Sequence, residues 1–375
     1  MNSEKPLWER RMRAPQLVTF SLINAAVSWA AKSTDRGVLL ATSSGRAEVY
    51  AFDGAQAPAT LRQVSDRPQG TMGGAISSDG SHVMWFDEHD GNEVGRWVRE
   101  PFAGPDAGPA VVLLADLPPS YSAGVVALPD LTYIGRLTDD GFELAVSDSS
   151  GVGSVLLSTA EPSELIDVNA DSTMALVSFA PDGDWLHPGI RVVNLTTGAI
   201  VAELVDKDLA LTPRGFAPEH GDNRVIVVHE RADRDAVLVW EPESGAELPL
   251  SIPLSGDVSA RWSSDAQTLL VTCAELGRHT LHRYSLADES LHELPVPRGT
   301  VFAASSRPDG SVHALVSSTA TPPQLIRVGD GPVVDLGAAP PSSVLAEDVF
   351  AEGPGGRVHA FMMRPKDVEP PARCI

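Results

Sequence analysis

The chain has 375 residues, enough for a large core, and a formal net charge of -22 with acidic residues scattered along it. This balance argues against a nucleic-acid partner, because a phosphate backbone requires a basic surface. No apolar stretch is long enough to span a membrane, so no membrane partner is expected. Its two cysteines, Cys273 and Cys374, make no disulfide framework and indicate a reducing, cytoplasmic compartment.

Residues 1–32 are expected to lie before the main body of the fold. Leu7, Trp8 and Met12 have near-helical spacing, which predicts a short helix that ends around Pro15. The apolar run Leu17 to Ala31 follows three arginines and has the outline of a secretory signal. Because polar residues interrupt this run and glutamates precede it, we favour a lead-in strand of a cytoplasmic protein over secretion.

The stretch Ile76 to Val98 predicts a turn, a strand, a second turn and a second strand. Ser78-Asp79-Gly80 has the composition of a tight turn. His82 to Phe86 is apolar and too short for a helix, which indicates a strand buried on both faces, and Val94 to Val98 forms the returning strand. A two-stranded unit cannot bury both faces alone, so the fold requires further copies of it.

Such copies recur through residues 33–336. The turn signal is strong at Ala180-Pro181-Asp182-Gly183, Ser263-Ser264-Asp265-Ala266 and Arg307-Pro308-Asp309-Gly310, and weaker at Asp35-Arg36-Gly37, Pro129-Asp130 and Asn169-Ala170-Asp171. The units start about 42 to 49 residues apart, which is the period of four-stranded propeller blades. We therefore predict an all-β, seven-bladed β-propeller, with blades at about 33–66, 72–117, 121–159, 165–205, 209–253, 257–297 and 300–336.

The pattern ends in residues 337–375. Ala338 to Ser343 has the composition of a linker. Val344 to Phe350 and Val358 to Met363 predict one further hairpin around a glycine-rich turn. A lone hairpin is marginally stable in water, so we expect it to be the start of a second domain.

Acidic residues gather in the turn of the central repeat, at Asp87, Glu88, Asp90 and Glu93, beside His89. Their spacing does not match a calcium-binding EF-hand loop. Two interpretations stay open. The turn is either a solvated loop or a rim of the propeller mouth that meets the N-terminus of a peptide or a partner domain. In the second interpretation these four acidic residues are the candidate substrate-gating residues.

Other candidate residues favour structural roles. His279 and His282 lie on opposite sides of a predicted strand, without further ligands, so we expect neither a metal site nor a cofactor. Five tryptophans in or beside strands are predicted to pack between blades rather than to stack on nucleic-acid bases: Trp85, Trp97, Trp185, Trp240 and Trp262.

A set of segments in order along the chain carries a family resemblance: Trp8 to Pro15, Val49 to Asp53, Val64 to Thr71, Met84 to Trp97 and Glu352 to Pro365. Together they resemble the N-terminal half of the prolyl oligopeptidase family of serine peptidases, closest to its acylaminoacyl-peptidase-like branch. The last segment is similar to the family's crossover into the catalytic domain. The resemblance implies a seven-bladed propeller that caps an α/β-hydrolase domain carrying a Gly-x-Ser-x-Gly nucleophile.

The family's catalytic motifs do not occur in this sequence. Neither Gly-x-Ser-x-Gly nor His-Gly-Gly is present, so no catalytic residue is assigned and the chain is expected not to hydrolyse peptides. The resemblance then implies a non-catalytic gate that admits short peptides to a hydrolase domain. A deliberate truncation, a frameshifted gene and a split enzyme with the hydrolase on another chain all remain open.

Two other classes of function remain open. The first is a free-standing propeller that acts as a binding scaffold, although repeats of the Gly-His…Trp-Asp type are absent. The second is a metal-dependent lactonase-like propeller, which would need carboxylates and asparagines converging in the channel. In every case an uncovered apolar face is expected to favour association with a hydrolase domain or with a second copy of the chain.

Overall fold

The computed structural model describes residues 23–71, 73–88, 90–336 and 344–364. The predicted helix over Leu7 to Met12, His89, the linker at 338–343 and Cys374 lie outside these residues. The described chain is built almost wholly of antiparallel strands, with three short 3-10 turns: η1 (Gly54–Gln56), η2 (Pro105–Ala107) and η3 (Pro181–Gly183). None of its helical segments has the length and hydropathy needed to cross a membrane. The all-β prediction is confirmed.

The first three groups of strands follow the order of the chain. The first sheet contains β1 (Ile23–Trp29), β2 (Arg36–Ala41), β3 (Glu48–Asp53) and β4 (Arg62–Gln63). The next contains β5 (Gly74–Ile76), β6 (His82–Glu88), β7 (Val94–Pro101) and β8 (Val111–Val112), and it is joined through a β7–β9 pairing to β9 (Ser120–Ala127), β10 (Leu131–Thr138), β11 (Gly141–Asp148) and β12 (Gly153–Thr159). Strand β1 lies inside the segment that the sequence assigned to a lead-in strand, and it pairs with β2 as the edge of the first sheet.

The remaining strands continue the same order. They are β13 (Ser163–Val168), β14 (Met174–Phe179), β15 (Gly189–Asn194) and β16 (Ile200–Leu204), then β17 (Leu211–Phe216), β18 (Val225–His229), β19 (Ala236–Glu241) and β20 (Ala246–Pro249). The last sheet runs through β21 (Asp257–Trp262), β22 (Thr268–Glu275), β23 (Arg278–Ser285), β24 (Leu291–Ser306), β25 (Val312–Ser317), β26 (Gln324–Arg327) and β27 (Gly331–Pro332). Strand β24 is long because its first part pairs with β23 and its second part with β25.

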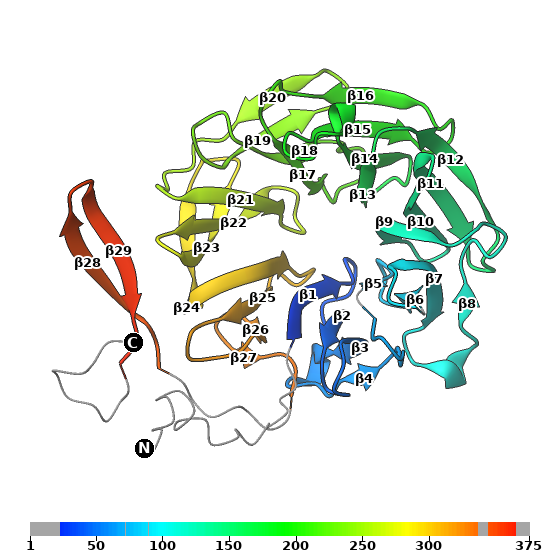
Figure 1. Ribbon diagram of the computed structural model, residues 1–375, viewed down its shortest axis with the longest axis horizontal. Coiled ribbons are helices and arrows are strands. Elements are labelled where there is room, and N and C mark those ends of the chain that lie inside the picture. Colours follow the sequence, from blue (N-terminus) through cyan, green and yellow to red (C-terminus); the bar gives the residue numbers. More distant parts are fainter. Residues whose placement is uncertain (1–22, 72, 89, 337–343, 365–375) are drawn as a thin grey trace, which may run out of the picture.

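The sheets succeed one another around a common centre, and the first strand of each four-stranded group lies nearest to that centre (Figure 1). Clusters of buried apolar side chains lie between successive groups, for example where Ile226 and Val239 pack with Val258 and Leu269. Each group therefore buries its faces against its neighbours, as the two-stranded repeat in the sequence requires.

The repeated Asp-containing turns form as predicted. A side-chain oxygen of Asp79 accepts the backbone N–H of Ser81, and Asp309 makes the same contact with Ser311 at 2.9 Å. Gly80 lies at φ +75°, in the left-handed region that glycine tolerates. The turn also joins neighbouring sheets, because Ser78 donates its N–H to the carbonyl of Ala127 in β9.

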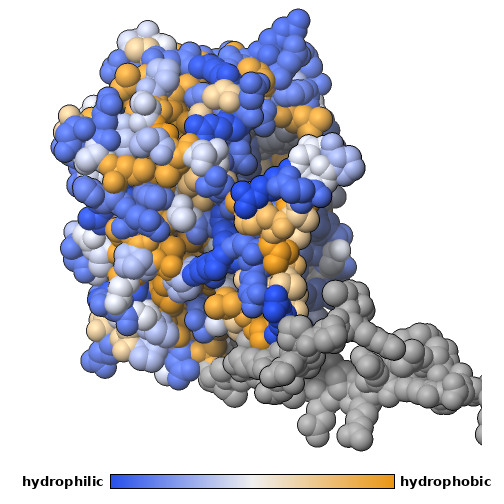
Figure 2. All heavy atoms as spheres, turned by 90° about the vertical axis from the view of Figure 1, so that its left-hand side faces the viewer, coloured by the Kyte–Doolittle hydropathy of each residue, from blue (hydrophilic) through white to orange (hydrophobic). Residues whose placement is uncertain are grey.

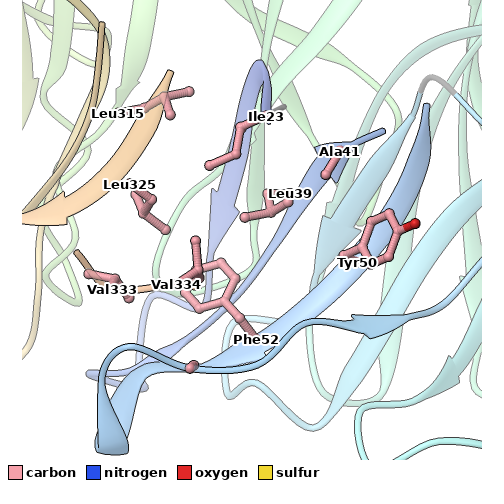
Figure 3. Close-up of a cluster of buried hydrophobic side chains, with 10 residues drawn as sticks. Ile23, Leu39, Ala41, Tyr50, Phe52, Leu315, Leu325, Val333 and Val334 are labelled. Carbon is pink, nitrogen blue, oxygen red and sulfur yellow. The ribbon is translucent and has the colours of Figure 1, made fainter. Parts of the chain in front are cut away.

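The first sheet contacts the last one through an apolar cluster. Ile23, Leu39 and Phe52 face Leu325 and Val333 across this junction (Figure 3). The backbones of Ala59 and Val334 form a parallel bridge, with the Ala59 N–H donating to the Val333 carbonyl at 2.7 Å. Segments from opposite ends of the described chain therefore share one core.

A buried arginine reinforces this junction. Arg307 follows β24, is 1% exposed, and extends its guanidinium to the loop that joins β1 to β2. There it donates to the carbonyls of Ala30, Ser33 and Thr34. Burial lowers the pKa of Arg307 to about 10, so the side chain is charged at neutral pH. A charge-assisted donor thus binds three carbonyls of this loop, of which that of Ala30 also accepts the backbone N–H of Ser33.

The hairpin of β28 (Glu347–Gly353) and β29 (Gly356–Met362) stands beside the last sheet, as the pattern of residues 344–363 predicts (Figure 1). Arg278 at the start of β23 holds it by donating to Asp348 and by lying over the ring of Phe361. On the side of the molecule that carries the hairpin, hydrophobic residues lie in patches between hydrophilic ones (Figure 2).

The prediction for the tryptophans is partly wrong. Trp85, Trp97 and Trp240 are buried within the sheets, whereas Trp185 is 47% exposed. Trp185 follows η3 in a loop between β14 and β15, where no neighbouring sheet covers it. Its apolar ring alone could not indicate that it lies in a loop.

Replacing Arg307 by Met is expected to lower the free energy of unfolding by about 3 to 5 kcal/mol, because the hydrogen bonds of a buried guanidinium to three carbonyls of the β1–β2 loop are lost. The matched control is Arg46→Met, since the exposed Arg46 donates to a single carbonyl, that of Arg67. Urea denaturation measures both variants. Equal effects of the two substitutions would contradict the role given to Arg307.

His313 makes the stability depend on pH. It is fully buried in β25, and burial together with the charges of Arg307 and Arg327 lowers its pKa to about 4. The unfolded state then binds more protons than the folded state between about pH 6.5 and pH 4, so stability falls as the pH falls through this window. At about 1.4 kcal/mol per pKa unit, the loss is about 3 kcal/mol. His313→Leu should abolish this part of the pH dependence, and the exposed control His292→Leu should retain it; identical urea midpoints against pH for all three proteins would refute the assignment.

Candidate functional site

The acidic turn proposed as a gate is only partly a loop. Asp87 and Glu88 are the last two residues of β6. Asp87 forms a two-pronged ion pair with Arg67 at 2.8 Å, and that guanidinium lies 4.7 Å from the ring centroid of Trp85. This geometry gives Asp87 a structural role, because its carboxylate orders the side chain that covers a buried tryptophan.

The other acidic candidates differ in their surroundings. Glu88 is half-buried, whereas Asp90 and Glu93 are exposed, and the backbone of Glu93 lies at φ +63°. Contact of these side chains with a peptide or a partner stays a prediction.

A serine, a histidine and an aspartate come together in the turn before β6. The Ser81 hydroxyl lies 2.8 Å from Asp79 Oδ1 and 2.8 Å from His82 Nδ1. In a hydrolytic triad the aspartate orients the histidine through its other ring nitrogen. Here Asp79 contacts the serine itself, and burial and Arg99 lower the pKa of His82. These three residues therefore form the hydrogen bonds of a turn. They do not form a hydrolytic triad, because no carboxylate of the described residues orients His82 as a base.

A charged recess lies at the inner strands. A cavity of about 240 Å³ opens between β17, β21 and β24. Along β21, exposed and half-buried residues alternate with buried ones, so that Asp257, Ser259 and Arg261 share one face. Arg214 reaches the same cavity from β17.

The two arginines in this cavity are short of counter-ions. Among the described residues, neither Arg214 nor Arg261 forms an ion pair or a side-chain hydrogen bond, and the Arg214 Nε is buried without a partner. Desolvation lowers the pKa of both side chains, and the charge of Arg261 lowers that of Arg214 further. Arg261 is exposed to water, yet the surrounding protein removes part of its hydration. A side chain inside a recess has both properties, whereas one on the open surface does not.

Carboxyl groups border this basic pair. Burial raises the pKa of Asp167, in β13, to about 6, although the N–H groups of Phe216 and Val168 donate to it. Asp235 and Asp257 also line the cavity, where burial and the Asp257 charge raise the pKa of Asp235 and the charge of Arg214 opposes that rise. The cavity therefore holds both basic and acidic side chains.

His279 and His282, the two histidines considered as metal ligands, make different contacts. His282 is buried and contacts the Thr280 hydroxyl at 2.9 Å, whereas His279 contacts the backbone of Val301. Within the described ranges, no group of three or more His, Cys, Asp or Glu side chains is placed to bind a metal ion. These contacts support the structural reading of both histidines.

The cavity was not predicted from the sequence. The alternation Asp257-x-Ser259-x-Arg261 in a short strand was available as a signal that polar side chains share one face. Their convergence with Arg214, from a different group of strands, depends on the packing of β17 beside β21. No local pattern encodes that packing.

Comparison with known proteins identifies the architecture. No family model and no curated protein sequence matches the chain. Among 737 matching solved chains is one from a study of two prolyl endopeptidases, on the role of inter-domain dynamics in catalysis and specificity. It aligns with a TM-score of 0.66 at 14% sequence identity, over 93% of this chain and 54% of the other. The fold is that of a propeller domain.

At this identity the likeness establishes the fold and not the chemistry. This chain spans about half the length of the prolyl endopeptidase it matches. The resemblance found in the sequence and the structural likeness thus agree on a propeller fold.

Proposed function

We propose that this chain is the non-catalytic, substrate-gating propeller portion of a serine peptidase that acts on short peptides, in the acylaminoacyl-peptidase-like branch of the prolyl oligopeptidase family. The observation that carries the proposal is the structural likeness to the propeller part of a prolyl endopeptidase over 93% of the chain. The two cysteines favour a cytoplasmic location.

We further infer that the sheets are seven blades of a closed ring. In support, the strand order divides into seven groups of four when β24 is counted in the last two. The core shared by the first and last sheets supports closure, since a ring requires contact between its two ends. The inner strands would then line a central passage, and the charged cavity would open onto it.

The hairpin offers a surface for the catalytic domain or for a second copy of the chain. Phe350, Val358 and Phe361 each expose more than two-fifths of their surface, and Met363 exposes 59%. Apolar side chains grouped in this way favour a partner over water. In this proposal the partner covers the hairpin and receives peptides that have passed the propeller.

The gate is tested by binding. A short peptide labelled on an internal lysine is expected to bind saturably, and the same sequence within a folded protein is expected not to bind. Ser259→Trp, which fills the central cavity, should abolish peptide binding. The matched control Ser244→Trp, on the exposed turn between β19 and β20, should leave it unchanged. Equal binding to both variants would place the peptide elsewhere and refute a central gate.

Two readouts on the same sample complete this test. A fluorophosphonate probe is expected to label no serine of the chain, and labelling at a single serine would contradict a non-catalytic role. Sedimentation should show association through the hairpin face, and a monodisperse monomer would contradict that part of the proposal.

A further inference from the structure

The central cavity contains a combination of groups that its structural role does not require. Its walls include Arg214 from β17, Asp257, Ser259 and Arg261 from β21, Phe302 from β24, and Asp235. Arg214 is half-buried and its Nε is withdrawn from water without a partner, which is costly and which packing alone does not explain. The volume of about 240 Å³ is large enough for a small molecule.

Most arginines in the described part of the chain hold a carboxylate or a backbone carbonyl. Acidic residues number 50 against 28 basic ones. Arg67, Arg191 and Arg231, for example, each hold one or two carboxylates. Arg214 and Arg261 hold none, although Asp167 lies near enough to influence Arg261. Asp167 is instead bound to the backbone N–H groups of Val168 and Phe216.

We propose that Arg214 and Arg261 together bind a carboxylate, and that this is the C-terminal carboxylate of a short peptide inside the propeller. A guanidinium donates two parallel hydrogen bonds to a carboxylate, and the buried Nε of Arg214 is a donor awaiting an acceptor. This inference rests on the proposed function, because it specifies how a peptide would be held in the gate.

The rest of the cavity favours a peptide over a bare anion. Asp257 precedes Arg261 by four positions on the same face of β21, about 13 Å along the strand. Asp257 would attract an ammonium group while Arg261, four positions along the strand, binds a carboxylate. Phe302, which is 46% exposed, provides an apolar wall for a peptide side chain. A free carboxylate or phosphate would use only the basic end.

Calorimetric titration distinguishes these ligands. The probes are trialanine with a free C-terminus, trialanine amide, acetate and inorganic phosphate, at equal ionic strength. The free acid should bind about tenfold or more tightly than the amide. Arg261→Gln and Arg214→Gln should reduce the affinity for the acid to that for the amide. The exposed control Arg46→Gln should leave both affinities unchanged.

Each other outcome overturns the inference in a recognisable way. Equal binding of the acid and the amide by the wild type would refute the carboxylate site and leave the peptide gate standing. Acetate or phosphate binding as tightly as trialanine would refute the peptide as ligand. Absence of binding by either peptide would refute the gate as well. Arg261→Lys, which keeps the charge, should retain part of the preference for the acid, so that a mere folding defect is recognised.

Discussion

The fold depends on the contact between its first and last sheets. Each group of strands in the middle of the chain has one neighbour before it and one after it in the sequence. The groups β1–β4 and β24–β27 each lack one such neighbour, and they bury the remaining face against each other. The apolar cluster around Phe52 and Leu325 buries that surface (Figure 3). The guanidinium of Arg307 donates hydrogen bonds to backbone carbonyls that apolar side chains cannot pair. Hydrophobic burial provides the driving force, and the arginine fixes the register of the junction.

This contact also determines which side chains meet at the centre of the molecule. When the sheets are held around a common centre, their first strands bring charged side chains from distant parts of the sequence together. Arg214 and Arg261 come from different groups of strands and reach one cavity, and the charge of Asp167 raises the pKa of Arg261, which burial lowers. The faces between successive sheets are packed with similar apolar side chains. The candidate binding groups therefore lie on the inner strands and on the hairpin.

The sequence was a good guide to whatever is local. Asp79 and Asp309 predict turns because their side chains accept the backbone N–H two residues later. Apolar runs such as Met174 to Phe179 predict strands because both faces of the strand are buried. It was a poor guide to long-range pairing. The salt bridge between Arg67 and Asp87 joins two residues that no local pattern pairs. Arg307 likewise has the sequence of an ordinary turn residue, and its partners lie near the other end of the described chain.

Hydrogen–deuterium exchange of the Arg307→Met variant tests the central claim most directly. If the junction between the first and last sheets holds the fold together, β1, β2 and β24 to β27 should exchange faster than in the wild type, while β13 to β20 on the far side keep their protection. Faster exchange confined to the turn at 307–310, or a uniform change across all strands, would contradict the account.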